Sequence, residues 1–312
     1  MKTFKPNLPF LKQWFLCGAF MFLISSCGSD IEPQMQEETK TGELTLQKLI
    51  IALKANKNPE KMLAEKRDLE DYLSEKLNRT VEVIIPTDSA IVVESFRNGT
   101  LDLGYLSSTD ASRNLDQKTA SILLVHLKNG KTSYNSVWLM HKGKPYQSIT
   151  DLKDKPVAFA SRSSTSGFLI PTWDLAQKGL VGPDSSLTDY FSKTIYGTGY
   201  VSAVEKVLSG EVEAAAVSDY VFEGDNKYLS NEQKSKLQIL QKQGPVPAHT
   251  LCIRGSISEN DQKFLQQALL EMNMENPELR DRIFNGELVV VDQDTHLQVT
   301  REALEIQKTL RP

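Results

Sequence analysis

Residues 156–176, with the sequence PVAFASRSSTSGFLIPTWDLA, decide the fold. The apolar run 156–160 predicts a buried strand, and residues 168–176 predict a helix. Between them, residues 163–167 supply four hydroxyl side chains and a glycine. The N-terminus of a helix has free N–H groups and partial positive charge, and hydroxyls can donate to oxyanion oxygens. A single Ser or Thr suffices as an N-cap, so four hydroxyls favour an anion site over a plain cap, which stays the alternative.

The charge around this turn separates it from a nucleotide P-loop. The turn contains no lysine, and Arg162 is the one cation beside it in sequence. A P-loop has the pattern G-x-x-x-x-G-K-[ST], whose lysine contacts phosphate. The sequence therefore predicts binding by neutral donors, with Gly167 allowing the ligand to approach closely.

The N-terminal segment resembles a secretion signal. Lys2, Lys5 and Lys12 precede an apolar stretch at 14–24, which is shorter than the ~20 residues that span a bilayer. It ends in LISSCG, which resembles a bacterial lipobox and makes Cys27 the predicted lipid-bearing first residue of the mature chain. An uncleaved anchor helix is the alternative. Either way, the rest of the chain is expected outside the cytoplasm, on the periplasmic or cell-surface side, and tied to a membrane.

Composition limits the partners. The formal net charge is −4, and without the three signal lysines 33 basic residues face 40 acidic ones, a balance of −7. An acidic chain without a basic block argues against nucleic acid. Beyond Cys17 and Cys27 the only cysteine is Cys252, so no intramolecular disulfide is expected in the mature chain. Its apolar surroundings predict a buried packing role.

Strand and helix patterns alternate along the chain and predict an α/β fold with mostly parallel sheets flanked by helices. Strands are predicted at 46–53, 81–85, 101–106, 122–126, 136–141, 156–160, 192–196, 212–217 and 251–253, and helices at 59–77, 89–97, 168–176, 201–208, 261–273 and 300–310. Turn sequences at Lys142–Pro145 and Gly244–Pro247 predict two crossovers between two lobes. The predicted division is a signal at 1–26, a flexible tether at 27–44, lobe 1 at 45–143 and 246–312, and lobe 2 at 144–245.

Four polar turns follow predicted strands. They lie at 107–109, 163–167, 197–200 and 218–220. Ligands of such sheets bind at the carboxyl ends of the strands. We therefore expect the four turns to face one cleft between the lobes.

Three motifs in order resemble the phosphate/phosphite/phosphonate-binding proteins of ABC transporters, which are type II periplasmic solute-binding proteins. STSGFLIP at 164–171 resembles the family's S-T-S-G-[FY]-L-x-P signature. NGTLDLGY at 98–105 and LSGEVEAAAVSD at 208–219 resemble two of its strand motifs. GPVP at 244–247 resembles its second crossover. The likeness runs collinearly over roughly residues 48–285.

The resemblance implies roles for particular residues. Backbone N–H groups and hydroxyls of the 164–167 turn would hold phosphoryl oxygens, and Tyr105 would line the wall of lobe 1. Asp219 would face the cleft, to meet a ligand cation or accept from a protonated ligand oxygen. The predicted ligand-binding set is Ser164, Thr165, Ser166, Gly167, Tyr105, Ser107, Tyr200 and Asp219. Core packing of Tyr105 and an N-cap role of Asp219 are the alternatives.

Two positions depart from the family pattern. Ser89 stands where the family often has a tyrosine, and Gly199-Tyr200-Val201 stands where it often has Gly-His-acid. Loss of the acid removes a partner for a ligand ammonium. Phosphite, phosphate or a simple phosphonate is therefore favoured over an aminoalkylphosphonate, and a different solute is also possible.

The predicted function is capture of a phosphorus oxyanion and its delivery to an ABC transporter permease, without catalytic residues, metal or other cofactor. A sensory or regulatory binding protein with a different small ligand is the alternative. A phosphatase or esterase is disfavoured because the chain lacks G-x-S-x-G and H-E-x-x-H, and its four histidines are scattered. His249 follows the second crossover and either reaches the cleft or serves the hinge.

Overall fold

The computed structural model describes residues 44–54, 59–86, 89–224 and 228–311. The N-terminal lysines, the apolar stretch, Cys27 and nearly all of the tether lie outside these residues. The signal, the lipid and the tether therefore stay predictions. Within the described ranges, no helix combines the length and apolar character needed to cross a membrane.

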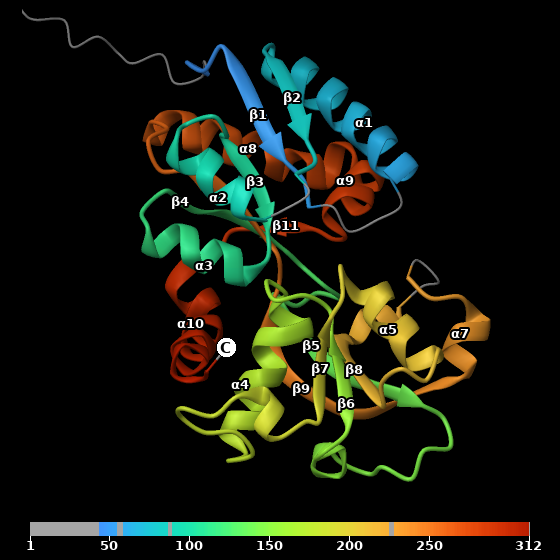
Figure 1. Cartoon of the computed structure of the whole chain (residues 1–312). Helices are drawn as coiled ribbons and strands as arrows, with labels where there is room; N and C mark the ends of the chain where they lie inside the picture. Colours follow the sequence, from blue (N-terminus) through green and yellow to red (C-terminus); the bar gives the residue numbers. More distant parts are fainter. Residues whose placement is uncertain (1–43, 55–58, 87–88, 225–227, 312) are drawn as a thin grey trace, which may run out of the picture. The chain divides into compact units, whose positions relative to one another are not determined.

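The first sheet has the strand order β11-β4-β10-β3-β1-β2 (Figure 1). Its strands are β1 (Lys48–Ala52), β2 (Thr80–Ile84), β3 (Leu103–Leu106), β4 (Ala120–His126), β10 (Thr250–Arg254) and β11 (Leu288–Val289). β1 pairs in parallel with both β2 and β3. β10 lies antiparallel between β3 and β4, so these two strands point the same way. Their carboxyl ends therefore share one edge of the sheet.

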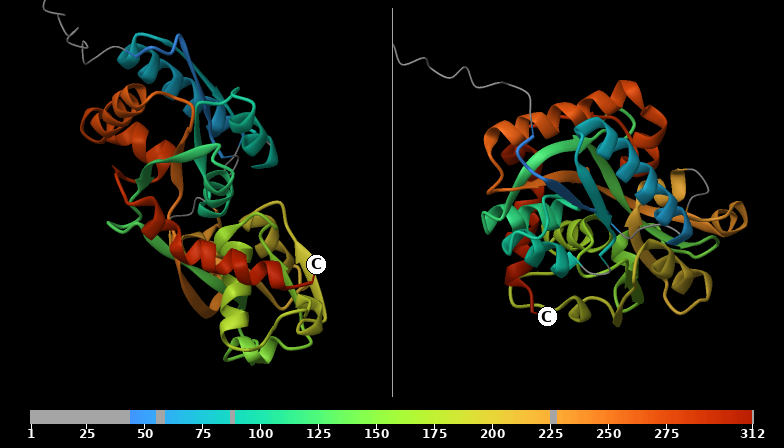
Figure 2. Two further views of the ribbon diagram at one scale, coloured as in Figure 1. Left: turned by 90° about the vertical axis from the view of Figure 1, so that its left-hand side faces the viewer. Right: turned by 90° about the horizontal axis from the view of Figure 1, so that it is seen from above.

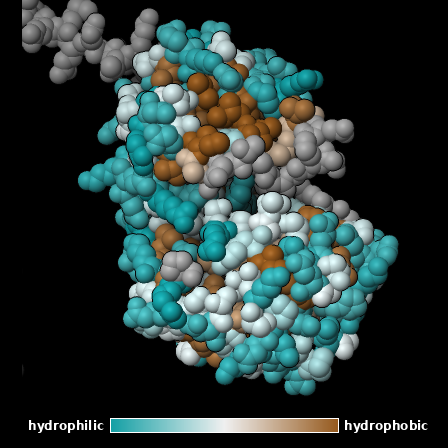
Figure 3. Space-filling model, in the orientation of Figure 1, coloured by the Kyte–Doolittle hydropathy of each residue, from teal (hydrophilic) through white to brown (hydrophobic). Residues whose placement is uncertain are grey.

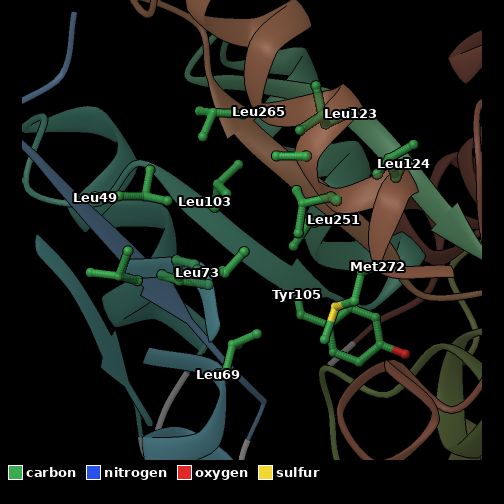
Figure 4. Close-up of a cluster of buried hydrophobic side chains, with 14 of the residues drawn as sticks. Leu49, Leu69, Leu73, Leu103, Tyr105, Leu123, Leu124, Leu251, Leu265 and Met272 are labelled. Atoms are coloured by element: carbon green, nitrogen blue, oxygen red, sulfur yellow. The ribbon is translucent and has the colours of Figure 1, made fainter. Parts of the chain in front are cut away.

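Helices cover both faces of this sheet. One face packs against α1 (Pro59–Leu77), α8 (Glu259–Glu275) and α9 (Pro277–Phe284), through a cluster rich in leucine (Figure 4). The other face packs against α2 (Ser89–Arg97), α3 (Ser108–Asp116) and the start of α10 (Gln293–Thr309). Cys252 lies in this second cluster with 1% exposure, which confirms its predicted packing role. Burial raises the pKa of its thiol to about 12.

The second sheet has the order β7-β6-β8-β5-β9. Its strands are β5 (Ser133–His141), β6 (Pro156–Phe159), β7 (Lys193–Tyr196), β8 (Ala214–Ser218) and β9 (Leu237–Pro247). β6 is parallel to β7 and β8, whereas β5 is antiparallel to β8 and β9. The carboxyl ends of β6, β7 and β8 thus lie together.

The second sheet is also covered on both faces. α4 (Ile170–Gln177) packs on one face, where Leu175 meets Trp138 and Phe159. α5 (Tyr200–Leu208) and α6 (Asp219–Glu223) pack on the other. Shorter elements complete this part: the 3₁₀ helices η1 (Ile149–Leu152) and η3 (Leu187–Asp189), the π-helix η2 (Thr165–Leu169) and α7 (Asn231–Ser235). The predicted α/β class, with two sheets flanked by helices, is confirmed. Both sheets are mixed rather than mostly parallel, because β10 and β11 in the first sheet and β5 and β9 in the second pair antiparallel to their neighbours.

The chain passes between the two sheets twice, at residues 127–132 and 248–249. The first connection contains a tight turn in which Asn129 has φ 50° and Gly130 has φ 73°. Such an Asn-Gly pair suits a type I′ turn, and Lys128 and Lys131 form an isolated bridge across it. The turn at 142–145, expected as a lobe boundary, instead leads from β5 to η1. The extended pairing of β5 with β8 and β9 places β5 in the second sheet.

Several elements differ from the sequence-based prediction. α3 begins where only a polar turn was expected, and β9 and α9 were not predicted. α10 begins at Gln293 rather than at 300. It packs both against elements of the first sheet's layers and against elements of the second sheet's layers. Leu297 packs in the cluster of Cys252, whereas Ala303 packs with residues of η2 and α4. Figure 2 shows α10 in two further orientations, running alongside elements of the second sheet.

Exposed apolar side chains lie mainly on the layers of the first sheet. Leu63 and Ile91 are 52% and 48% exposed, on α1 and α2, and Met274 and Val290 are also exposed. Figure 3 shows hydrophobic residues gathered on this part of the face in view, while the part around the second sheet is mostly hydrophilic or neutral.

Candidate functional site

The predicted hydroxyl turn lies at the start of a continuous helical segment. β6 ends at Phe159, η2 begins at Thr165, and α4 follows without a break. The Ser164 side chain caps the segment by accepting from the backbone N–H of Gly167 at 3.0 Å. No acidic residue stands in the first turn. The N-terminal partial charge of this helical segment is therefore not offset by a carboxylate of the turn itself.

Gly167 is required for close packing of the turn. A Cβ added at this position would lie 2.4 Å from Cβ of Ala160 and 2.9 Å from Oγ of Ser164. It would also lie 3.2 Å from the carbonyl oxygen of Ala216. The glycine therefore lets η2 sit directly against β6 and β8. The part of Gly167 in ligand approach stays a prediction.

A second helix N-terminus meets this turn. Ser107 caps α3, and its Oγ accepts from the N–H of Asp110 while donating to Oδ2 of that residue. The N–H of Thr109 donates to Oγ1 of Thr165 at 3.2 Å, and the two threonine hydroxyls are 2.8 Å apart. Oγ of Ser108 donates to the same Thr165 oxygen at 3.3 Å. Strand ends of the two sheets are thus joined through one hydroxyl.

Ser166 is the centre of a second group of hydroxyls. Its Oγ lies 2.8 Å from the hydroxyl of Tyr200 and 2.7 Å from Oγ of Ser218. The hydroxyl of Tyr134 lies 3.5 Å away. Ser166 is fully buried, and its carbonyl accepts from Oγ of Ser136 at 2.6 Å. The hydroxyl groups around Ser166 and Thr165 are called the hydroxyl cluster below: Ser108, Thr109, Tyr134, Ser164, Thr165, Ser166, Tyr200 and Ser218.

The hydroxyl cluster can exchange its internal partners for an anion. Each hydroxyl can donate one hydrogen bond, and here the acceptors are other hydroxyls. A hydrogen bond to a charged acceptor is roughly twice as strong as one between neutral groups. An oxyanion with several oxygens can therefore replace the weaker hydroxyl acceptors. It would also receive backbone N–H donors from the two helix N-termini.

Lys54, just after β1, adds positive charge near the cluster. Burial raises the pKa of Tyr134 and of Tyr220. In Tyr200 burial also acts to raise the pKa, but the charge of Lys54 and hydrogen bonds with Ser166 and other hydroxyls outweigh it, so the pKa is lowered. The positive charge of Lys54 also favours an anionic ligand here.

A cavity of about 460 Å³ adjoins the cluster. Tyr220 belongs to both, since its hydroxyl is 3.4 Å from that of Tyr200 while the residue also lines the cavity. The remaining walls include Tyr105, His126, Lys128, Tyr228, His249 and Arg280. Burial lowers the pKa of His126 to about 4, and burial followed by the charge of Lys54 holds the pKa of His249 well below its usual value. Both imidazoles are therefore neutral at pH 7.

Tyr105 occupies two environments. Its ring is 3% exposed and belongs to the leucine-rich cluster, where Figure 4 places it beside Met272. Its hydroxyl donates to the carbonyl of Phe284 at 2.9 Å and lies 2.9 Å from Nδ1 of His126. Tyr105 therefore lines the cavity while its polar atom is held by the protein.

Asp219 is the first residue of α6 and directly precedes Tyr220. Its Oδ2 accepts from the backbone N–H and the side-chain amide of Asn135, at 3.0 and 3.1 Å. Its Oδ1 accepts from the N–H of Tyr220 at 2.8 Å. Both carboxylate oxygens thus have protein donors, which leaves little capacity for a ligand cation.

The structure brings together some predicted residues and separates others. Ser164, Thr165, Ser166 and Tyr200 meet in one cluster, and Ser107 caps the helix that joins them. Tyr105 and Asp219 lie outside this cluster. Ser108, Thr109 and Ser218 belong to predicted polar turns but were missing from the predicted ligand-binding set. Tyr134 and Lys54 had no local signal, because the pairing of distant strands positions them.

No group of three or more potential metal ligands is found among His, Cys, Asp and Glu side chains of the described residues. The neighbouring histidines His126 and His249, whose ring centroids are 5.9 Å apart, have no acidic or thiol partner that completes such a set.

With this geometry in place, comparison with known proteins defines the family. Residues 51–295 match the family described as "ABC transporter, phosphonate, periplasmic substrate-binding protein". This match covers more than half of the chain, and the protein belongs to that family. Among curated relatives, the phosphate-import protein PhnD of Mycolicibacterium smegmatis is 27% identical over 205 residues. The match spans 63% of this chain and 62% of that relative, which is less than two thirds of its length.

Solved structures share the fold. PhnD1 from Prochlorococcus marinus, determined in complex with methylphosphonate, matches with a TM-score of 0.72 and 20% identity. The match covers 84% of this chain and 99% of that one. A binding protein component of an ABC phosphonate transporter from Pseudomonas aeruginosa matches with a TM-score of 0.71 and 17% identity, covering 84% and 87%. At these identities the likeness is one of fold.

Proposed function

We propose that the protein captures a phosphorus oxyanion (phosphonate, phosphite or phosphate) at the hydroxyl cluster and delivers it to the permease of an ABC transporter. Family membership supports the transport role, and the curated relative is named for phosphate import. We further propose that the protein acts outside the cytoplasm, anchored by lipid on Cys27, and that it works by binding alone, without a catalytic step.

The observation that carries this proposal is the meeting of two capped helix N-termini through Thr165. The N–H of Thr109 and the hydroxyl of Ser108 already donate to one oxygen, that of Thr165. Ser166, one residue on, contacts two further hydroxyls within 2.8 Å. A tetrahedral oxyanion presents several acceptor oxygens in different directions, which suits donors that arrive from both sides.

The two connections between the sheets supply a route for closure. The two sheets, each with its covering helices, would move relative to one another about residues 127–132 and 248–249. A ligand that accepts from Thr109 on one side and from the 164–167 turn on the other stabilises the closed arrangement only. Such a difference in affinity between two arrangements is what a permease could recognise.

Thermal unfolding of the full-length protein in mild detergent tests the proposal. The ligands are phosphate, phosphite, methylphosphonate and, as a matched oxyanion that lacks phosphorus, sulfate. A ligand at 100 times its Kd adds about 2.7 kcal/mol to the free energy of unfolding. We expect such a shift with at least one phosphorus oxyanion and none with sulfate.

Two substitutions localise the binding. Thr165→Ala removes the hydroxyl that joins the two turns. Loss of a hydrogen bond to a charged group costs about 1.5–3 kcal/mol, so affinity should fall roughly 10- to 100-fold. Ser235→Ala, at an exposed hydroxyl on α7 that bonds only the local carbonyl of Glu232, is the control and should bind normally. Equal affinity of both variants, or no shift with any phosphorus oxyanion, would overturn the proposal.

A further inference from the structure

The cavity beside the hydroxyl cluster carries charge that the binding of a phosphoryl group does not use. Lys128 lies on its wall, and its Nζ sits 5.0 Å from the ring centroid of Tyr220. Within the part of the chain that the structure describes, no carboxylate lies within ion-pair distance of this ammonium. The tight turn at Asn129–Gly130 fixes the backbone on which Lys128 stands.

The acidic groups around the cavity already have partners or point to solvent. Asp281 pairs with Arg280, and Glu223 pairs with Lys242. Asp219 accepts three hydrogen bonds from the protein. Glu287 is exposed at the rim. A ligand ammonium would therefore meet Lys128 without a free buried carboxylate to compensate it.

The other walls suit a small anion with a short apolar stem. Tyr105, Tyr220 and Tyr228 supply aromatic surface. His126 and His249 stay neutral in their buried positions, and a neutral imidazole offers one donor and one acceptor. The volume, about 460 Å³, lies within the range of pockets that enclose whole small molecules. A single phosphoryl group bound at the hydroxyl cluster would leave this space unused.

We propose that the ligand carries a second anionic group, joined to its phosphoryl group by a short carbon chain, and that this group enters the cavity and pairs with Lys128. Phosphonocarboxylates are the simplest ligands of this class. The inference rests on the proposed function, since it takes the hydroxyl cluster as the phosphoryl site. Tyr220, which reaches the cluster with its hydroxyl and lines the cavity with its ring, would lie along the carbon chain.

A series of ligands that differ only at the far end tests this inference. Titration calorimetry on the full-length protein would compare 3-phosphonopropionate, 3-aminopropylphosphonate and propylphosphonate, which end in a carboxylate, an ammonium and a methyl group. Because one charged hydrogen bond to Lys128 is gained, we expect 3-phosphonopropionate to bind about 10-fold more tightly than propylphosphonate. The aminoalkyl compound should bind more weakly than propylphosphonate.

Lys128→Gln identifies the cation responsible. It should remove the advantage of the carboxylate while leaving the affinity for propylphosphonate within about twofold. Lys131→Gln is the matched control, because Lys131 faces Lys128 across the same turn but does not line the cavity. The control should keep the advantage of the carboxylate.

The outcomes separate this inference from the proposed function. If propylphosphonate and methylphosphonate bind but the carboxylate gains nothing, or if Lys128→Gln keeps that gain, the inference alone fails. Tightest binding of 3-aminopropylphosphonate would also overturn it. If no phosphonate binds to the wild-type protein, the proposed function fails and the inference fails with it.

Discussion

Two strand–turn–helix units meet at Thr165, and they differ in how each treats the positive end of its helix. The unit from β3 to α3 is capped by Ser107 and has Asp110 in the first turn. The unit from β6 through η2 to α4 is capped by Ser164 and has no acid in the first turn. A carboxylate in the first turn offsets the helix dipole. The first unit thus compensates its own helix end, whereas the second leaves its helix end available to an external anion.

The largest expected effect comes from Gly167, which lets the second unit pack against its sheet. In Gly167→Ala the new Cβ would lie 2.4 Å from Cβ of Ala160, so the turn must shift. Overpacking of this kind typically costs about 1–3 kcal/mol of unfolding free energy. The displaced turn should also lose affinity for an oxyanion. Urea unfolding measures the first effect and calorimetry the second.

The control for this substitution is Gly182→Ala, where an added Cβ meets nothing within 4 Å. It should leave both stability and affinity near those of the wild type. If the two variants unfold at the same urea concentration, Gly167 has no packing role and the turn is less tightly held than the contacts indicate.

A second prediction makes the two units alike by adding an acid to the second one. In Ser163→Asp a carboxylate stands beside the cap Ser164. This carboxylate should stabilise the helix by about 0.3–1 kcal/mol through its favourable interaction with the helix dipole. The same charge repels an oxyanion, and at about 4 Å such repulsion is worth roughly 1–4 kcal/mol, so affinity should fall at least about fivefold.

Stability and affinity thus change in opposite directions, which a merely damaged protein would not show. Ser163→Asn introduces a side chain of the same size as Asp but without the charge. This variant should bind the oxyanion like the wild type. An Asp variant that binds the oxyanion normally would mean that the ligand does not approach this helix end.

The two strand–turn–helix units also differ in how well the sequence predicted them. The segment at 156–176 gave strand, turn and helix in the right places, since the apolar periodicity and the hydroxyl run are local signals. α3 was missed even though Ser107 and Asp110 have the spacing of a helix start, because the short helix carries few apolar residues. β9 was missed because its polar residues between 238 and 243 hide a strand that pairing with β5 defines.

The hydroxyl cluster was predictable only in part. The strand-end turns supplied Ser164, Thr165 and Ser166 from sequence alone. Tyr134 is the second residue of β5, just after the first connection between the sheets, and only the antiparallel pairing of β5 brings it to Ser166. Lys54 follows β1, some 110 residues before the turn, and reaches the site through sheet order. Tertiary arrangement, not local pattern, places these two residues.

A third prediction uses pH to compare the two sides of the site. The cavity wall near the first sheet contains His126, whereas the hydroxyl cluster contains no histidine. In an unfolded chain a histidine titrates near pH 6.5, but burial lowers the pKa of His126 to about 4. Above about pH 6.5 neither state binds the proton, so this residue adds no pH dependence.

As the pH falls from about 6.5 toward 4, the unfolded chain binds a proton that folded His126 does not. The free energy of unfolding should then fall by about 1.4 kcal/mol per pH unit for this one proton. His249, also lowered by burial, adds to the slope. In His126→Gln the dependence of the unfolding free energy on pH should become shallower by about 1.4 kcal/mol per pH unit, the contribution of this one proton. Urea unfolding at several pH values measures this dependence. His141→Gln, at the end of β5, is the comparison, and a slope unchanged in His126→Gln would contradict the prediction.

The smallest expected effect comes from removing the acid of the first unit, which makes the two helix ends alike in the opposite sense. In Asp110→Asn the dipole of α3 loses its compensating charge, so the protein should lose about 0.3–1 kcal/mol of stability. The freed helix end then attracts the oxyanion more strongly, and the same energy corresponds to an affinity gain of roughly two- to fivefold. The control for this substitution is Asp116→Asn, at the other end of the same helix, which changes the net charge equally but lies at the negative end of the dipole.

The Asp116→Asn variant should leave the affinity unchanged and the stability equal or slightly higher. If both variants raise the affinity alike, the ligand responds to the overall charge of the protein. A gain in Asp110→Asn alone would mean that the N-terminus of α3 faces the bound anion, and that both units contribute to its binding.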